Sequence, residues 1–155
     1  MIFEKQVWMQ RAGEFPQSDS EYFNLMSRAI FSAGLGSHVI ESRWDAITAV
    51  FYNFDPHKID KMDADDVTRL LDNSAIIRNQ RKIEAVIKNA SIFTACTKEY
   101  GSFRAYLDTL GASSDLETTA KSLGKTFVHL GQTSALLFLF SAGWRPQENT
   151  RTKKK

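Results

Sequence analysis

The apolar residues of this chain recur at three- and four-residue intervals along most of its length. The clearest stretch is residues 80–100, whose apolar face carries Ile83, Val86, Ile87, Ala90 and Phe93. This spacing is typical of amphipathic helices, and no alternating run of the kind that forms a strand persists beyond a few residues. The sequence therefore predicts an all-α fold.

Glycine, proline and capping residues divide this pattern into about seven short helices. The expected ranges are 20–33, 38–53, 63–71, 80–100, 103–110, 113–123 and 132–140. Asp63 is placed to cap the third helix and Ser102 the fifth, because short side-chain oxygens accept the free N–H groups there. Ser113 or Ser114 is expected to cap the sixth helix, which should end at Gly124.

The length of 155 residues suits one compact domain, which we place at residues 1–144. Eleven Phe, four Tyr and three Trp supply enough apolar volume for a core, which excludes disorder for most of the chain. Residues 145–155 carry five Lys or Arg against one Glu, and few apolar groups. We expect them to form a basic tail without fixed structure.

The sequence lacks the residues that most metal and cofactor sites need. Cys96 is the only cysteine, which excludes a disulfide framework and a cysteine-based zinc cluster. His38, His57 and His129 lie far apart without the spacing of metal ligands. No phosphate-binding loop, dinucleotide motif or zinc-protease motif is present. We therefore expect no metal and no cofactor.

Neither a membrane span nor a secretory signal is visible. The longest apolar stretch, residues 134–144, is shorter than the ~20 residues that cross a bilayer. Residues 1–20 carry charges throughout and lack the apolar core of a signal peptide. A single free thiol fits a reducing compartment. We expect a cytoplasmic protein without membrane contact. If its partner is DNA, the protein would be associated with the nucleoid.

The net charge of +2 is unevenly distributed along the chain. Residues 55–72 hold six Asp against three basic residues, whereas residues 121–155 hold seven Lys or Arg against one Glu. A basic C-terminal third suits a polyanionic partner. The alternative is a solubilising tail, since four of these charges lie in residues 151–155.

One local feature is a short turn, Leu130-Gly131, between two apolar helices. The second helix should start at Gln132 or Thr133, so its free backbone N–H groups would point outward and suit one phosphate. A side chain in place of Gly131 would hold that phosphate away from the backbone. The alternative is an ordinary turn between two core helices.

A second local feature is Leu35, which lies between Gly34 and Gly36 in the break between two expected helices. An apolar side chain presented on such a loop is suited to act as a wedge that enters a base stack. The alternative is that Leu35 closes over the core.

These two features occur in order with three further motifs. The motifs are Phe54-Asp55-Pro56, then Ile76-Ile77-Arg78-Asn79-Gln80-Arg81-Lys82-Ile83, then Asn89-Ala90, and they are followed by YGSFRAYL at residues 100–107. Over residues 23–144 the chain resembles the 3-methyladenine DNA glycosylase I (Tag) family. Within the helix-hairpin-helix DNA glycosylase superfamily, the resemblance is to the shorter, Tag-like branch.

The resemblance implies a single all-α domain with a helix-hairpin-helix element near its C-terminus and a cleft for one flipped base. It assigns the phosphate-gripping hairpin to Leu130, Gly131, Gln132 and Thr133. It makes Leu35 the wedge that fills the gap left by the extruded base, which lowers the cost of unstacking. The charged residues Arg78, Asn79 and Arg81 would contact phosphate or line the cleft, with a solvated loop as the alternative.

The chain departs from the family pattern at several positions. Ser37 and His38 stand where the family has a tryptophan after the wedge loop, and Ala29 stands where the better-known branch has a pocket glutamate. The two Cys and two His that hold zinc in that branch are absent. No Asp follows Gly131, whereas other superfamily members carry a catalytic Asp there. The chain also looks shortened at its C-terminal end relative to the Tag-like branch.

The candidates for the substrate pocket are the residues nearest to the wedge loop. They are Phe31, Ser37, His38 and Trp44, with Tyr52 as a further aromatic candidate. Glu41 is the only acid close to Leu35, so we expect it to balance a cationic base or an oxocarbenium-like sugar as the catalytic group. Its alternative is a solvated helix edge shared with Trp44.

The first function hypothesis is therefore a DNA N-glycosylase of base-excision repair. It would be a hydrolase that flips and releases an alkylated purine of the 3-methyladenine type. Its partner would be double-stranded DNA with an alkylated or abasic site, and the protein would act as a monomer. A second hypothesis is a DNA-structure- or lesion-binding protein that has lost the catalytic pocket. A third is a helical protein–protein interaction domain.

Overall fold

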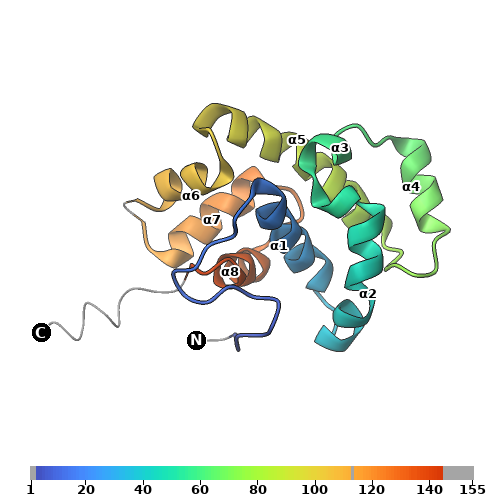
Figure 1. The fold of residues 1–155 in the computed structure, drawn as a ribbon, viewed down its shortest axis with the longest axis horizontal. Coiled ribbons are helices and arrows are strands. Elements are labelled where there is room, and N and C mark those ends of the chain that lie inside the picture. The colour runs from blue at the N-terminus through green and yellow to red at the C-terminus, as the bar shows by residue number, and fades with distance from the viewer. Residues whose placement is uncertain (1–2, 113, 145–155) are drawn as a thin grey trace, which may run out of the picture.

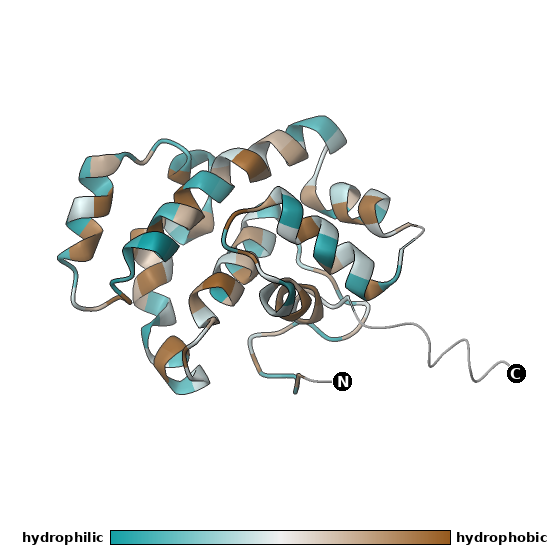
Figure 2. Ribbon diagram, turned by 180° about the vertical axis from the view of Figure 1, so that it is seen from behind, coloured by the Kyte–Doolittle hydropathy of each residue, from teal (hydrophilic) through white to brown (hydrophobic). Residues whose placement is uncertain are grey.

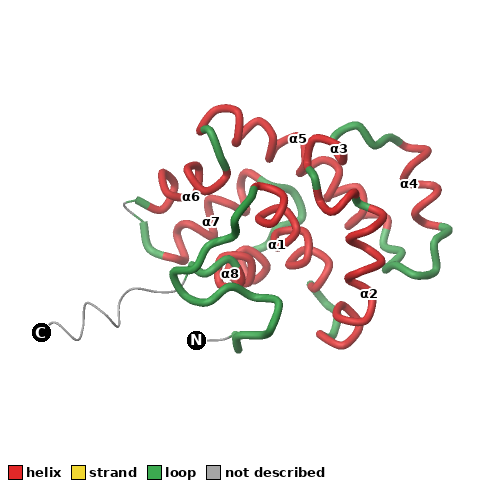
Figure 3. The backbone as a smooth tube through the Cα atoms, in the orientation of Figure 1, coloured by secondary structure: helices red, strands yellow, loops and turns green. Residues whose placement is uncertain are grey.

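A computed structural model describes residues 3–112 and 114–144, and in these ranges the chain consists of helices and loops without a strand (Figure 3). The predicted all-α class is confirmed. The helices are α1 (Asp19–Ser32), α2 (Ser37–Val50), α3 (Pro56–Ile59), α4 (Ala64–Leu71), α5 (Gln80–Tyr100), α6 (Phe103–Gly111), α7 (Leu116–Thr126) and α8 (Gln132–Ser141). A 3-10 turn, η1 (Tyr52–Phe54), joins α2 to α3. The expected basic tail at 145–155 lies outside the described residues.

Helix α1 lies in the middle of the fold and contacts α2, α5, α6 and α8 (Figure 1). Helices α7 and α8 pack side by side, and the long helix α5 contacts α3, α4 and α6. Apolar and polar residues recur in turn along the helices (Figure 2), as expected of amphipathic helices that pack on one side. The apolar helix α8 is largely buried.

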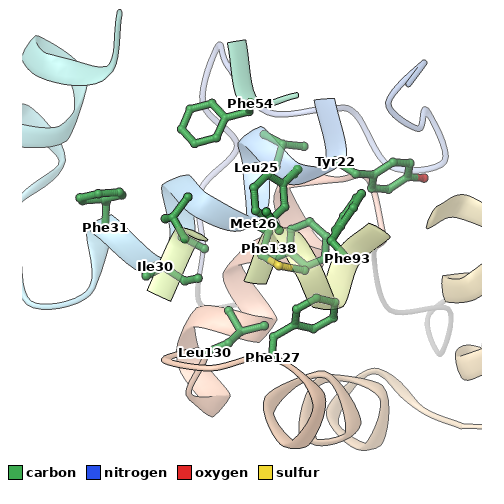
Figure 4. Packing of buried hydrophobic residues seen from close by; sticks show 14 of the residues in the cluster. Tyr22, Leu25, Met26, Ile30, Phe31, Phe54, Phe93, Phe127, Leu130 and Phe138 are labelled. Atoms are coloured by element: carbon green, nitrogen blue, oxygen red, sulfur yellow. The ribbon is translucent and has the colours of Figure 1, made fainter. Parts of the chain in front are cut away.

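The core is unusually rich in aromatic rings, which come from helices distant in sequence (Figure 4). The rings of Phe93 and Phe103 stack with their centroids 4.2 Å apart, which joins α5 to α6. Trp44 stacks on Phe54 at 5.3 Å, which ties α2 to the 3-10 turn. Such pairs contribute about 0.5–1.5 kcal/mol each beyond the burial of their area.

Most helix boundaries follow the local signals in the sequence. The predicted range 80–100 is confirmed, and Gly101 ends α5 with a φ of +93°. Asp63 caps α4, since its side chain accepts from the Asp66 N–H. The Asp66 side chain in turn accepts from the Asp63 N–H, which completes a capping box. Ser102 caps α6 as predicted.

One predicted helix end was wrong, and one helix was missed. The helix expected over 38–53 ends at Val50, because Tyr52, Asn53 and Phe54 have φ values between +55° and +58°. The short helix α3 was missed; it begins at Pro56, whose fixed φ suits a first helical position, and Asp55 caps it.

The predicted limits of α7 were also wrong. Its N-terminal cap is Asp115 and not Ser114, while Ser113 lies outside the described residues. The helix continues through Gly124 to Thr126. A Cβ atom on Gly124 would lie 2.9 Å from the carbonyl oxygen of Leu130. This glycine therefore marks a close approach between α7 and the turn that follows it, and not a helix end.

The segment before α1 is fixed to the end of α8 by backbone hydrogen bonds. The N–H of Gln10 donates to the Ser141 carbonyl at 2.8 Å, and the N–H of Gly13 donates to the Gly143 carbonyl at 2.9 Å. Gly143 has a φ of +91°, and a Cβ there would lie 2.5 Å from the carbonyl oxygen of Glu14. Only glycine fits this position without displacing the N-terminal segment.

We expect Gly143→Ala to lower the free energy of unfolding by about 2–3 kcal/mol, because it adds both a strained φ and a backbone clash. Urea denaturation of the purified protein measures this. Gly36→Ala is the matched control: Gly36 has a φ of −74° and no atom within 4 Å of an added Cβ. Equal stability of the two variants would contradict the assignment.

Candidate functional site

A cavity of about 400 Å³ lies between the N-terminal segment, the end of α1, the start of α2 and α8. Its walls include Trp8, Met9, Arg28, Leu35, Ser37 and Leu137. The volume is in the range of small-molecule sites and suffices for one purine base. The cavity therefore lies directly beside the loop that the sequence singles out as a wedge.

The wedge loop, residues 33–37, connects α1 to α2. Leu35 lies on it with 38% of its surface exposed, so the predicted alternative of closure over the core is not what the structure shows. Gly34 has a φ of +79°, a conformation that side chains other than glycine rarely adopt. The loop therefore presents an apolar side chain to solvent at the edge of the cavity.

Lys82 of α5 fixes the start of this loop by hydrogen bonds. Its Nζ donates to the carbonyl oxygens of Phe31 at 3.0 Å and of Ala33 at 2.6 Å, at the C-terminal end of α1. A cation there also complements the negative end of the helix dipole. The side chain is buried, and burial lowers the pKa of Lys82. The charge is thus committed to holding the loop.

The hairpin between α7 and α8 has a buried anchor and an exposed tip. Leu130 is 3% exposed, whereas Gly131, Gln132 and Thr133 are exposed. Gly131 is the N-cap of α8 without a side-chain cap, and an added Cβ there meets nothing within 4 Å. The first N–H groups of α8 are therefore free of a capping side chain, which is the arrangement an anion can use.

Asn89 holds the hairpin in place from α5. Its Nδ2 donates to the Val128 carbonyl at 3.0 Å, and its Oδ1 accepts from the Val128 N–H at 2.8 Å. Asn89 is fully buried. The two bonds together fix the orientation of the backbone just before the turn. His129, the next residue, takes a φ of +59°.

Lys82 and Asn89 are seven residues apart on the same helix, which is about two turns and ~10 Å along the axis. Both side chains therefore leave α5 on the same face, one toward the wedge loop and one toward the hairpin. Helix α5 thus sets the distance between the two features that the sequence nominated for DNA contact.

The charged residues before α5 are placed differently from one another. Arg78 and Arg81 are exposed and available to an anion. Asn79 is the N-cap of α5, with its side chain accepting from the Lys82 N–H at 3.1 Å. Asn79 therefore has a structural task, whether or not it also meets DNA.

The predicted pocket residues separate into two groups. Ser37 lines the cavity and His38 beside it is exposed. Phe31 is fully buried and Trp44 nearly so; the two rings meet edge to face, with centroids 6.1 Å apart. The indole N–H of Trp44 donates to Asn24 Oδ1 at 3.1 Å. These two aromatic residues belong to the hydrophobic core and do not line the cavity.

Glu41 lies on α2 with its side chain 67% exposed, and its Oε1 accepts from Arg28 Nη2 at 2.8 Å. Arg28 itself is buried, and its guanidinium carbon lies 4.0 Å from the ring centre of Trp8 and 5.5 Å from that of Trp44. Burial lowers the pKa of Arg28, and the hydrogen bond to Glu41 opposes this shift. The group stays charged at neutral pH.

Four residues of this site were not assigned a role from the sequence. Lys82 and Asn89 belong to the motifs that carried the family resemblance, so the sequence marked these positions but did not indicate what they do. The sequence did not mark Trp8 or Arg28. Trp8 lies outside the stretch of resemblance, and Arg28 lies within a helix whose other residues are mostly apolar. Their position in one cavity emerges only from the packing of the N-terminal segment on α1.

Two general properties of the described residues bear on the kind of site. Residues 3–112 and 114–144 contain no cluster of three His, Cys, Asp or Glu side chains arranged to hold a metal ion. Every helix in these ranges is too short or too polar to cross a bilayer.

The all-helical fold, the hairpin before α8 and the exposed loop beside a base-sized cavity are the arrangement that the sequence resemblance to DNA glycosylases implies. The profile of the methyladenine glycosylase family matches residues 6–137. The chain therefore belongs to the methyladenine glycosylase family, and the prediction of a DNA-3-methyladenine glycosylase-like hydrolase is confirmed at the level of the family.

Individual relatives agree with this placement. A DNA-3-methyladenine glycosylase of Haemophilus influenzae is 30% identical over 129 residues, 72% of this chain and 70% of that protein. DNA-3-methyladenine glycosylase 1 of Escherichia coli is 34% identical over 79 residues, 50% of this chain and 42% of that protein.

Solved structures are similar over nearly the whole fold. A mutant of 3-methyladenine DNA glycosylase I from Staphylococcus aureus superposes with a TM-score of 0.77 at 26% identity, over 90% of this chain and 82% of that one. A variant of 3-methyladenine DNA glycosylase I (TAG) in complex with 3-methyladenine gives a TM-score of 0.76 at 26% identity, with the same coverage.

We expect Lys82→Met to lower the free energy of unfolding by about 2 kcal/mol, because two carbonyl oxygens lose a charged donor. Loosening of the wedge loop should also weaken binding to DNA that contains an abasic site. Lys88→Met is the control, since Lys88 is exposed on the same helix. Urea denaturation and fluorescence anisotropy measure the two effects; a Lys82 variant that matches the control in both would refute the role.

We expect Asn89→Ala to lower the free energy of unfolding by about 2–3 kcal/mol, because the N–H and C=O of Val128 both lose their partner. Hydrogen exchange of the residues around the turn should accelerate. Ser91→Ala, an exposed position two residues further along α5, should change stability by less than about 0.5 kcal/mol. Unchanged exchange in the Asn89 variant would show that the hairpin is held by other contacts.

Proposed function

We propose that this chain is a DNA N-glycosylase of base-excision repair that extrudes an alkylated purine of the 3-methyladenine type from double-stranded DNA and releases it. The observation that carries the proposal is the exposed Leu35 on a braced loop beside a cavity of base size. Membership of the methyladenine glycosylase family supports it.

In this proposal the hairpin and the wedge loop divide the work of DNA binding. The free N–H groups at Gly131, Gln132 and Thr133 take one phosphate, and Arg78 and Arg81 add positive charge near the start of α5. Leu35 enters the stack where the base leaves. Filling that gap offsets part of the few kcal/mol that unstacking costs.

The extruded base then enters the cavity, with Trp8 and Ser37 among its walls. A purine methylated at N3 is cationic and already a good leaving group, so little acid–base chemistry is needed. Tighter binding of the transition state than of the ground state does the work. Glu41, which is largely exposed and pairs with Arg28 at 2.8 Å, balances the positive charge that develops on the sugar. A second carboxylate, Glu4, lines the cavity itself.

In this scheme the protein binds a single DNA duplex, and one copy of the chain is enough. Its product is an abasic site, which the wedge and hairpin continue to hold until release. The reaction uses water alone and needs neither a metal nor an organic cofactor. The place of action is the DNA of the nucleoid, in the cytoplasm.

The test is release of free base from alkylated duplex DNA, resolved by chromatography against a sample without protein. We expect 3-methyladenine above the spontaneous rate. Absence of release together with tight binding to an abasic duplex would overturn the enzymatic proposal and leave a lesion-binding protein. Absence of both would refute any DNA function.

The hairpin is tested separately with Gly131→Asp, which places a carboxylate where a phosphate is expected. We expect affinity for abasic duplex to fall by about tenfold or more at ~0.1 M salt, with normal stability because the site has room. Thr109→Asp, an exposed position on α6 with the same charge change, is the control. Equal losses in both variants would mean that the hairpin is not the phosphate site.

A further inference from the structure

The most exposed large apolar side chain among the described residues is Val7, with 99% of its surface accessible. Four other large apolar side chains in these ranges are exposed, and two of them, Leu35 and Val39, lie on the wedge loop and in the first turn of α2. A single exposed apolar residue needs no explanation, whereas several at one site do. The position of Val7 decides whether it belongs to this group.

Val7 lies beside the same cavity as the wedge loop. Its chain neighbours Gln6 and Trp8 line the cavity from the N-terminal segment, while Leu35 and Ser37 line it from the wedge loop. Two separate walls of one cavity therefore each carry an exposed apolar side chain. Because a DNA duplex is much wider than this cavity, a duplex that delivers one base into it lies against both walls.

The backbone around Val7 is held in place, although the side chain itself packs against almost nothing. The N–H of Met9 donates to the Gln6 carbonyl at 3.0 Å, which closes a turn that contains Val7. Met9 is buried, and the N–H of Gln10 donates to the Ser141 carbonyl of α8 at 2.8 Å. A contact residue on a fixed support loses little conformational entropy on binding. The turn thus presents Val7 much as the loop held by hydrogen bonds presents Leu35.

We propose that Val7 is a second wedge residue. It packs on the nucleotide beside the extruded one from the N-terminal wall of the cavity, while Leu35 fills the gap from the wedge loop. The inference rests on the proposed glycosylase function. The partner of this surface is the opened duplex, and Val7 touches the face of a base or sugar and no phosphate.

An apolar contact of this kind acts on the opening of the duplex and not on bond cleavage. In an intact duplex the base faces are stacked on one another, so Val7 finds little apolar surface to cover. When one nucleotide leaves the stack, the faces of its neighbours become exposed to water. Covering them stabilises the opened state, so Val7 favours DNA with a gap over intact DNA and adds nothing to the electrostatic part of binding.

Binding to duplexes with and without an abasic site, measured by fluorescence anisotropy, tests this role. We expect Val7→Ser to weaken binding to the abasic duplex by about three- to tenfold, because apolar area is no longer buried. Binding to undamaged duplex should not change. The slope of log affinity against log salt should also stay the same, because no phosphate contact is lost. Val7→Ile keeps the apolar surface and should retain the affinity of the wild type.

This result cannot arise from loss of structure. Since the Val7 side chain is almost fully exposed, we expect Val7→Ser to leave the urea denaturation curve unchanged. Tyr100→Ser is the matched control, because Tyr100 is also an exposed apolar residue but lies at the C-terminal end of α5 and does not line the cavity. We expect this variant to bind both duplexes as the wild type does.

The outcomes separate the role of Val7 from the proposed function. Wild-type affinity of Val7→Ser for the abasic duplex would overturn the role of Val7 alone. An equal loss on both duplexes, or a changed salt slope, would indicate a contact with the DNA backbone and would also overturn it. Wild-type protein that binds abasic and undamaged duplexes equally would overturn the proposed function, and the role of Val7 with it.

Cross-linking locates the contact on the DNA. With the photoreactive residue p-benzoylphenylalanine in place of Val7, irradiation of the complex with an abasic duplex should join the protein to a nucleotide next to the abasic site. The same group in place of Tyr100 should give no such product. Cross-links that form only several base pairs away from the abasic site would refute the placement of Val7 at the gap.

Discussion

The site depends on two side chains that leave the same face of α5. Lys82 binds the carbonyl oxygens at the end of α1, and Asn89 binds both backbone groups of Val128 before the hairpin. A helix is stiff over two turns, so these bonds give the wedge loop and the turn before α8 a fixed separation. Each of the two is short and irregular by itself, and α5 joins them.

Aromatic packing makes this frame rigid. Phe93 on α5 stacks on Phe103 of α6 and contacts Phe127, the residue that precedes the hairpin backbone held by Asn89. On the other side, Phe31 joins the end of α1 to Trp44 of α2. The aromatic residues that seemed suited to a pocket from the sequence thus serve as the support of the pocket, while Trp8 and Arg28 form its surface.

The sequence predicted the helices well where local signals decide, and the site less well where distant segments meet. Gly101 and the Asp63 capping box act within a few residues, so α5 and α4 were found. The backbone at Tyr52–Phe54 is left-handed although the segment contains no glycine, so no signal in the sequence marks this turn. Arg28 is invisible as a site residue because its partners, Trp8 and Glu41, lie on other segments of the chain.

Helix α8 contributes residues to the hairpin, to the cavity and to the contact with the N-terminal segment. Its first turn is the hairpin tip, Leu137 lines the cavity, and Ser141 near its end holds the N-terminal segment that carries Trp8. A helix of ten residues is only ~15 Å long and does not bend appreciably. The turn before α8 and the cavity wall at Leu137 therefore belong to one short, stiff unit, and any displacement of α8 moves both together.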